Sequence, residues 1–458
     1  MKFRSFFDKV AWSIVLILSL FIIGMVAGGD FTEPRIQYFN GQKQAIAAQT
    51  GQFLFRFNRL MDEKSVESSF RIFPAIKGKF SWSGRTFAFT ADAPLHYDEH
   101  FTITFIGAHD RAGKVMPAIT LQAKTKEQSL LFLDEQGRVQ QLVLAANTVK
   151  SLTPEHLFVQ QFSVSPLGTH LALLATTSKD NSTDRSEFRL YIYDLNAGNL
   201  QLVNNEQGKV LDELQWLPDG SGIGYTFINM SNNTEGIAWY EMASEKVQEI
   251  ATGKARAYSF YFTPDGNKIV YINSDGALIL GDMPEGNGAL IATTFTDIVG
   301  FNETGDYFAY IAPQSVNAFD LTNQPILVNA EGNEKEIPLP ESTNFDMMFV
   351  PQTKKIVWTQ EISLGKERRD KIVAFDYEKN TFQVVIDRED CAAFHPTPNP
   401  DGSLLAWQCV ENDNKGYVLT GWNDYQGKIV TGKLWLKDFI SGEEKDLHIQ
   451  GAGMQFLP

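Results

Sequence analysis

Acidic residues recur at one position of a repeated pattern, six residues before a turn proline such as Pro264 or before the residue that replaces it. Carboxylates that are brought close together repel one another unless a cation or a basic group joins them. If the repeats gather these positions at one place, the sequence predicts a binding site for a cation or a basic peptide segment. An acidic composition can equally produce a hydrated vestibule without a ligand. The candidate binding residues at or beside this position are Gln160, Asp212, Glu213, Tyr258, Asp297, Asp346 and Asp390, and two further copies hold Phe345 and Ala452.

The element that must position these residues is a β-hairpin. In the copy at 260–271, two apolar runs flank the corner Pro264-Asp265-Gly266. Proline presets φ at a turn position, glycine supplies a positive φ, and the aromatic and β-branched flanks favour strands. A third apolar strand follows most hairpins, and the period of roughly 40 to 55 residues is that of four-stranded propeller blades.

The two ends of this array are predicted to complete each other. The segments 130–133 and 139–143 look like later strands of a blade without its first strand, and 453–458 looks like a first strand that stops at its corner proline. Pairing them would remove two exposed sheet edges. With the copies at 162, 214, 260, 299, 347 and 393, this composite blade predicts about seven blades, and six or eight remain open.

This pattern resembles the TolB-like and dipeptidyl-peptidase-like group of WD40-like propellers, whose repeat centres on a Ser-Pro-Asp-Gly corner. The resemblance covers residues 127–458 and implies the fold, but says little about function because propellers host many functions. Some propellers of this group accompany a serine hydrolase domain. That domain needs a Gly-x-Ser-x-Gly elbow, and the sequence contains no such pentapeptide.

The N-terminal segment predicts a membrane anchor. Residues 11–27 are almost entirely apolar and follow Lys2, Arg4 and Lys9, so a helix here would just span a bilayer with its N-terminus in the cytoplasm. The alternative is a cleaved signal peptide, for which Met25 is a poor match at the position that prefers a small residue. We expect a cytoplasmic tail at 1–10, a single-pass transmembrane anchor at 11–28, and the rest of the chain in the periplasm or outside the cell.

Residues 33–124 form a separate, non-repeating segment of short alternating strands, which favours a β-sandwich. The segment resembles the Ig-like domain of bacterial surface proteins, which implies a spacer or adhesion role without catalytic residues. The motif matches are Phe57-Asn-Arg-Leu-Met-Asp62, Ser65-Val66, Ile72-Phe-Pro74, Trp82-Ser-Gly84 and Asp110-Arg-Ala-Gly113.

The remaining reactive residues point to a disulfide and to no metal or cofactor. Folding the last hairpin about Pro400 places Cys391 and Cys409 on adjacent strands, where an oxidising compartment would permit a disulfide, the alternative being two buried thiols. The seven histidines show no metal-ligand spacing. A net charge of −15 argues against a general nucleic-acid binder, which needs a basic face.

The sequence thus predicts an all-β protein with one N-terminal transmembrane helix, an Ig-like β-sandwich and a propeller closed by its C-terminal strand. The expected function is a non-catalytic protein-binding or scaffold module in the cell envelope. The alternative is an envelope hydrolase that acts on polysaccharide or peptide at the mouth of the propeller channel, which would need paired carboxylates at a fixed separation.

Overall fold

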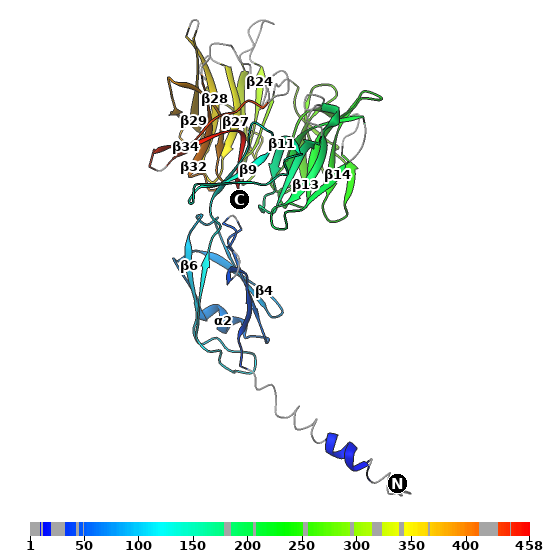
Figure 1. Cartoon of the computed structure of the whole chain (residues 1–458), viewed down its shortest axis with the longest axis vertical. Helices are drawn as coiled ribbons and strands as arrows, with labels where there is room; N and C mark the ends of the chain where they lie inside the picture. Colours follow the sequence, from blue (N-terminus) through cyan, green and yellow to red (C-terminus); the bar gives the residue numbers. More distant parts are fainter. Residues whose placement is uncertain are drawn as a thin grey trace. The chain divides into compact units, whose positions relative to one another are not determined.

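The structure is a computed structural model that describes residues 10, 12–19, 33–42, 45–48, 50–177, 185–204, 208–250, 255–293, 297–313, 323–338, 343–364, 367–411, 429–439 and 441–458. The chain divides into two compact units, one of residues 1–46, 51–93 and 99–125 and one of residues 47–50, 94–98 and 126–458. Almost all the named elements are β-strands (Figure 1), as the sequence predicts.

The predicted membrane anchor falls largely outside the described residues. Of residues 11–28, the structure describes 12–19, which are helical. No helix in the described part of the chain is both long enough and apolar enough to cross a membrane. The anchor, and the cytoplasmic tail that would precede it, therefore stay predictions.

The first unit contains two antiparallel sheets joined by a core of phenylalanines. One sheet has the strand order β1 (Ile36–Phe39), β2 (Gln52–Phe57), β5 (Thr86–Ala91), β4 (Gly78–Ser83), and the other has the order β3 (Phe70–Phe73), β6 (His100–Phe105), β7 (Ile119–Lys124). Phe55 of β2 meets Phe70 and Phe105 of the other sheet with ring centroids 6.2 and 5.2 Å apart. The short helix α2 (Glu63–Ser69) begins at Asp62, whose side chain accepts a hydrogen bond from the Ser65 amide. The assignment of this unit to the Ig-like group stays a prediction.

The second unit is built from repeated four-stranded antiparallel sheets. Five of them consist of consecutive strands: β11 (Phe158–Val164), β12 (His170–Thr176), β13 (Arg189–Asp194) and β14 (Leu200–Asn204); β15 (Lys209–Trp216), β16 (Gly222–Asn229), β17 (Thr234–Glu241) and β18 (Lys246–Glu249); β19 (Ala255–Phe262), β20 (Lys268–Asn273), β21 (Leu278–Asp282) and β22 (Gly288–Ala292); β23 (Asp297–Phe301), β24 (Tyr307–Pro313), β25 (Asn323–Asn329) and β26 (Glu334–Glu336); β27 (Thr343–Val350), β28 (Lys355–Leu364), β29 (Glu367–Asp376) and β30 (Thr381–Ile386).

The strands nearest the two ends of this unit belong to one larger sheet. Its order is β10 (Thr148–Ser151), β9 (Val139–Val143), β8 (Ser129–Leu133), β34 (Glu444–Leu457), β33 (Gly432–Asp438), β32 (Leu404–Glu411), β31 (Cys391–Pro398). The first part of β34 pairs with β33 up to Gly451, and the last part pairs with β8, with Gln455 opposite Leu131 and Phe456 opposite Leu130. The strand β34 therefore belongs to two four-stranded groups, one with β31, β32 and β33 and the other with β8, β9 and β10.

The first strands of the sheets lie side by side in a continuous series. Contacts join β11 to β15, β15 to β19, β19 to β23, β23 to β27, β27 to β31 and β31 to β34, and β34 also contacts β11. The amide of Gln455 on β34 donates to the Phe162 carbonyl at 3.0 Å and accepts from the Val164 amide at 2.9 Å, both on β11. The hydrophobic core lies between neighbouring sheets, where Leu190 of one sheet packs in the same cluster as Tyr225 of the next.

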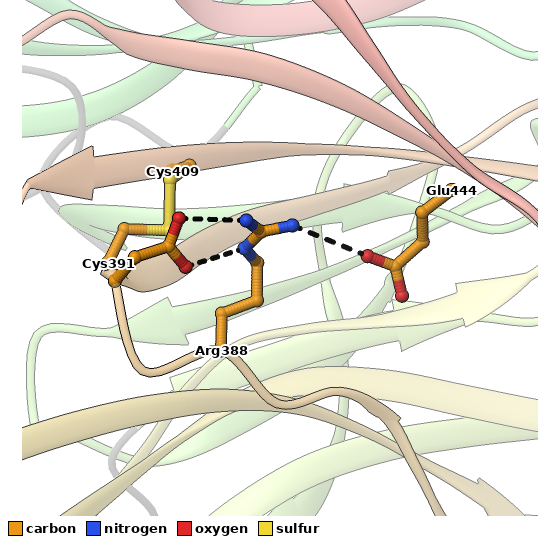
Figure 2. Close-up of a disulfide and its surroundings, with 5 residues drawn as sticks. Arg388, Cys391, Cys409 and Glu444 are labelled. Carbon is orange, nitrogen blue, oxygen red and sulfur yellow. Dashed lines mark hydrogen bonds and ion pairs between the residues drawn. A yellow bond between two sulfur atoms is a disulfide. The ribbon is translucent and has the colours of Figure 1, made fainter.

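A disulfide joins Cys391 on β31 to Cys409 on β32 (Figure 2), with an S–S distance of 2.06 Å. The two cysteines lie on adjacent strands, as the sequence predicted, and they are diagonal in the ladder because Cys409 lies opposite Ala393. Beside the disulfide, Arg388 lies 4.2 Å from the Trp435 ring centroid and reaches Glu444 at 3.8 Å. These contacts tie the entry of β31 to β33 and β34.

Candidate functional site

The first strands of four of the four-stranded groups carry an irregularity at the same place. The register with the second strand shifts after Asp212 on β15, after Phe345 on β27, after Phe394 on β31 and after Ala452 on β34. Such a bulge leaves one residue unpaired and turns its side chain in a new direction. The irregularity recurs in these repeats, so it is a regular structural feature of their first strands.

The residue that opens the bulge has a left-handed backbone in four of the strands. Its φ is 50° at Glu213, 55° at Asp346, 51° at His395 and 59° at Gly453. Residues other than glycine adopt this region uncommonly, and the cost of order 1–3 kcal/mol persists only where the surrounding structure demands it. Three of the four positions nevertheless hold a titratable side chain, which marks them as candidates for function.

Five consecutive first strands contribute one titratable side chain each to a single electrostatic cluster. In the order β15, β19, β23, β27 and β31, these residues are Glu213, Tyr261, Asp297, Asp346 and His395. We call this set the acidic arc. The charge of Asp297 acts on Glu213 and Tyr261, and the charge of Asp346 acts on Asp297 and His395. These interactions link the five strands in one series.

Glu213 is the most strongly perturbed carboxyl of the acidic arc. Burial, followed by the charges of Asp212 and Asp297, raises the pKa of Glu213 to about 8, and Arg185 opposes the shift. Glu213 is therefore mostly protonated at pH 7. Arg185 itself pairs with Asp212 through an Nη2 to Oδ2 contact of 2.5 Å, so its charge is shared with another carboxylate.

Asp297 occupies the middle of the acidic arc. Burial among protein atoms and the nearby charge of Asp346 raise the pKa of Asp297, and a 2.8 Å hydrogen bond from the Ile298 amide opposes the shift. Asp297 is nevertheless exposed to solvent. Burial, Glu213 and Asp297 together raise the pKa of Tyr261, so its hydroxyl stays a hydrogen-bond donor.

The acidic arc ends in an acid–base pair. His395 Nδ1 lies 2.9 Å from Asp346 Oδ2. Burial alone would lower the pKa of His395, but the charge of Asp346 and the hydrogen bond to its carboxylate outweigh burial and raise that pKa. The Asp346 carboxylate thus favours the protonated imidazole, whereas no basic side chain is among the causes of the shift at Asp297.

The structure brings together four of the residues that the sequence singled out and separates others. Asp212, Glu213, Asp297 and Asp346 interact. Gln160 lies at the bulge of β11, and its buried Oε1 finds no hydrogen-bond partner among the described residues. Tyr258 belongs to β19, but its side chain lies outside the described part of the chain.

Asp390 does not join the acidic arc. It forms hydrogen bonds of 2.8 and 2.7 Å with Arg388, which lower its pKa. Asp390 stands six residues before Pro396, but the turn of this copy is formed by residues 399–402, after Pro398. Counting from Pro400 places His395, not Asp390, level with Glu213 and Asp346. The sequence analysis therefore missed His395, which the repeated Pro-Asp-Gly corner could have revealed. It also missed Tyr261 and Arg185.

The acidic arc takes its members from five different strands. No group of three or more His, Cys, Asp or Glu side chains in the described residues is arranged to hold a metal ion. The arc offers a row of acceptors of graded acidity, one of them solvent-exposed, together with a phenol donor. Such a row can bind a cationic group, and a carboxyl that is protonated at neutral pH can also donate a proton.

Comparisons with known proteins identify the fold. No family model matches the chain. The C-terminal subunit of a tricorn-like protease from Sulfurisphaera tokodaii is 25% identical over 155 residues, which are 34% of this chain and 16% of that protein. The chain therefore matches less than a fifth of the length of this curated relative.

Several solved structures resemble the chain at low sequence identity. A prolyl endopeptidase, 11% identical, has a TM-score of 0.50 over 79% of this chain and 49% of its own. The β-propeller domain of the trilobed protease from Pyrococcus furiosus, 11% identical, has a TM-score of 0.49 over 77% of this chain and 96% of its own. TolB from Acinetobacter baumannii, 13% identical, has a TM-score of 0.43 over 73% of this chain and 83% of its own. The repeated four-stranded sheets and these likenesses give the second unit a β-propeller fold. At these identities the likeness concerns the fold alone.

Proposed function

We propose that this protein is a non-catalytic binding module of the cell envelope, and that its propeller holds a lysine- or arginine-bearing segment of a partner protein at the acidic arc. The observation that carries the proposal is the excess of carboxyl groups. Among the residues that the structure describes, the cluster contains only two basic side chains, Arg185 and His395, against four carboxyl groups. The carboxyl groups are those of Asp212, Glu213, Asp297 and Asp346. A cationic side chain would offset the burial and the carboxylate repulsion that together raise the pKa of Glu213.

A closed ring would make this arc a rigid receptor. The pairing of β34 with β8, and the hydrogen bonds from Gln455 to β11, support a seven-bladed ring that the C-terminal strand closes. In such a ring the first strands line the central channel, so the bulges direct the acidic arc into it. A preformed row of acceptors binds a flexible segment at a lower entropic cost than a row that must first be ordered.

The proposed binding event has a defined order of contacts. Asp297 is the exposed carboxyl and would meet an incoming ammonium or guanidinium group first. Glu213 would then lose its proton, because a positive charge nearby favours the carboxylate. The Tyr261 hydroxyl would donate to a backbone carbonyl of the same segment. Binding therefore couples to proton release near neutral pH.

The location in the envelope rests on two features. The apolar segment 11–28 with its basic flank supports a single-pass anchor that leaves the propeller outside the cytoplasm. The Cys391–Cys409 bond is of the kind that persists in an oxidising compartment. The partner is then another envelope protein, and the first unit would hold the propeller away from the membrane.

Calorimetry with a model cation tests the binding proposal. We expect a lysine-rich decapeptide to bind the full chain and a glutamate-rich decapeptide of equal length to give no heat. The double substitution Asp297→Asn/Asp346→Asn should weaken binding at least tenfold. Asp275→Asn, in an exposed turn of the same unit, is the matched control and should leave binding unchanged. Equal affinities for both variants would refute the acidic arc as the site.

One observation favours a second candidate function, an envelope hydrolase acting on polysaccharide or peptide. A carboxyl with a pKa of about 8 beside other carboxyl groups, as at Glu213, is typical of general acids in active sites. Fluorogenic peptides and nitrophenyl glycosides are suitable probes. Turnover that Glu213→Gln abolishes would support the hydrolase, whereas tight binding of the lysine-rich peptide without turnover supports the binding module.

A further inference from the structure

The first unit has an apolar groove between two sheet edges. The groove has a volume of about 490 Å³, and its lining includes Phe70, Arg71, Ala75, Lys77, Phe80 and Phe89. This volume lies within the range of ligand-binding pockets, ~300–1,000 Å³.

Two free strand edges border the groove. β3 is the terminal strand of its sheet and pairs with β6, and β4 is the terminal strand of the other sheet and pairs with β5. Residues 74–77 connect these two strands directly. The free edge of a terminal strand presents unpaired backbone N–H and C=O groups, which another extended chain can use.

Three aromatic rings form the floor of the groove. Phe70, Phe80 and Phe89 pack against one another with ring centroids 5.0 to 5.7 Å apart. Phe70 and Phe89 are buried, but Phe80 is 40% exposed although its ring belongs to this cluster. An apolar side chain that entered the groove would cover Phe80 and complete the cluster, and burial of apolar surface favours this contact.

The rim of the groove is basic on a chain that is acidic. Arg71 and Lys77 line it with one acidic residue, Asp92, and the exposed Lys79 follows on β4. The chain as a whole carries a net charge of −15. The Arg71 guanidinium is already oriented by hydrogen bonds to the Ser68 and Phe70 carbonyls at 2.9 and 2.7 Å. The local charge therefore complements an acidic partner.

We propose that this groove binds an extended segment of a partner protein in which apolar and acidic residues alternate. The segment adds as a strand to the free edge of β4, the longer of the two edges. Its apolar side chains enter the aromatic floor, and its carboxylates face Lys77 and Lys79. Backbone pairing supplies affinity in this mode of recognition, and the alternate side chains supply specificity.

Fluorescence anisotropy with a labelled peptide tests this proposal on the full chain. The probe is Ac-Glu-Val-Glu-Phe-Glu-Val-Glu-NH2, and we expect saturable binding. Ala75→Trp, which fills the groove from an exposed position, should weaken binding at least tenfold, and Lys77→Glu at least fivefold. Ala112→Trp and Lys64→Glu, at exposed positions that do not line the groove, are the matched controls and should bind like the wild type.

Two further probes separate strand addition from other occupants. A peptide with lysine in place of glutamate, and one N-methylated at alternate residues, should each bind at least tenfold more weakly. Equal binding of either peptide, or equal binding by Ala75→Trp, overturns the proposal. Sedimentation velocity should show that wild type and Ala75→Trp have the same oligomeric state. If the wild type dimerises and the variant does not, the groove binds a second copy of this chain and the proposal is wrong.

Discussion

The C-terminal strand offers the strongest test of the architecture, because one side chain there joins the two ends of the propeller. Phe456 is 5% exposed and lies opposite Leu130 in the ladder. It belongs to a buried cluster with residues of β8, β32 and β33, among them Phe132, Ala406 and Leu434. Truncating a buried phenylalanine to alanine typically costs 3–5 kcal/mol, so we expect Phe456→Ala to lower the free energy of unfolding by about 4 kcal/mol.

Urea titration followed by tryptophan fluorescence and far-ultraviolet circular dichroism measures this effect. Leu290→Ala is the control, because Leu290 is 56% exposed on the outermost strand β22 and its truncation should cost less than ~1 kcal/mol. Gln455→Leu, which keeps side-chain volume but removes the two hydrogen bonds to β11, should fall between them at ~1–3 kcal/mol. If Phe456→Ala is no more destabilising than Leu290→Ala, the C-terminal strand does not hold the propeller together.

Three further predictions concern covalent and titratable groups. Cys391→Ala/Cys409→Ala should cost ~3 kcal/mol, because the bond closes a loop of separation 18, and an unchanged urea midpoint would contradict this. The folded-state pKa of Glu213 is raised above its unfolded value, so stability is lost as pH rises from 4.5 towards about 8, and Glu213→Gln should raise the melting temperature at pH 8.5 but not at pH 4. The pKa of His395 is also raised, so the protonated ring stabilises the fold below pH 6.5 and this contribution is lost as pH rises through the folded pKa. His395→Gln should therefore lower the melting temperature more at pH 5.5 than at pH 8.5, and a pH-independent effect would mean that Asp346 does not hold the charge on the ring.

The repeated hairpins could be predicted from the sequence because their turn chemistry is local. A proline fixes φ at the corner and a glycine supplies the positive φ, which is 71° at Gly266 and 72° at Gly220. The pairing of Phe456 with the segment near Leu131 could be predicted from the same repeat. The segment after residue 130 lacked a first strand, and residues 453–458 resembled one. Local rules repeated through the chain thus specify the sheets and their order.

The acidic arc could be predicted only in part because it depends on bulges that no sequence rule marks. Glu213 and Asp346 adopt left-handed backbones that are uncommon for their residue types. His395 lies at the same place in a copy whose corner contains several prolines, so the count of six residues began at the wrong one. Tyr261 lies at a different position of its strand from the other members. Arg185 lies in the short 3-10 helix η3 (Arg185–Glu187), which only tertiary packing brings to the site.

The measurement that bears most directly on the proposed site is the number of protons released when a cation binds. Calorimetric titrations of the lysine-rich decapeptide at pH 7.5, in two buffers of different ionisation enthalpy, give this number. Because Glu213 has a pKa of about 8 and a nearby cation favours its carboxylate, the wild type should release a large fraction of one proton at this pH. Glu213→Gln should release almost none at saturating peptide. Binding without proton release by the wild type, or equal release by the variant, would contradict the placement of the cation at the acidic arc.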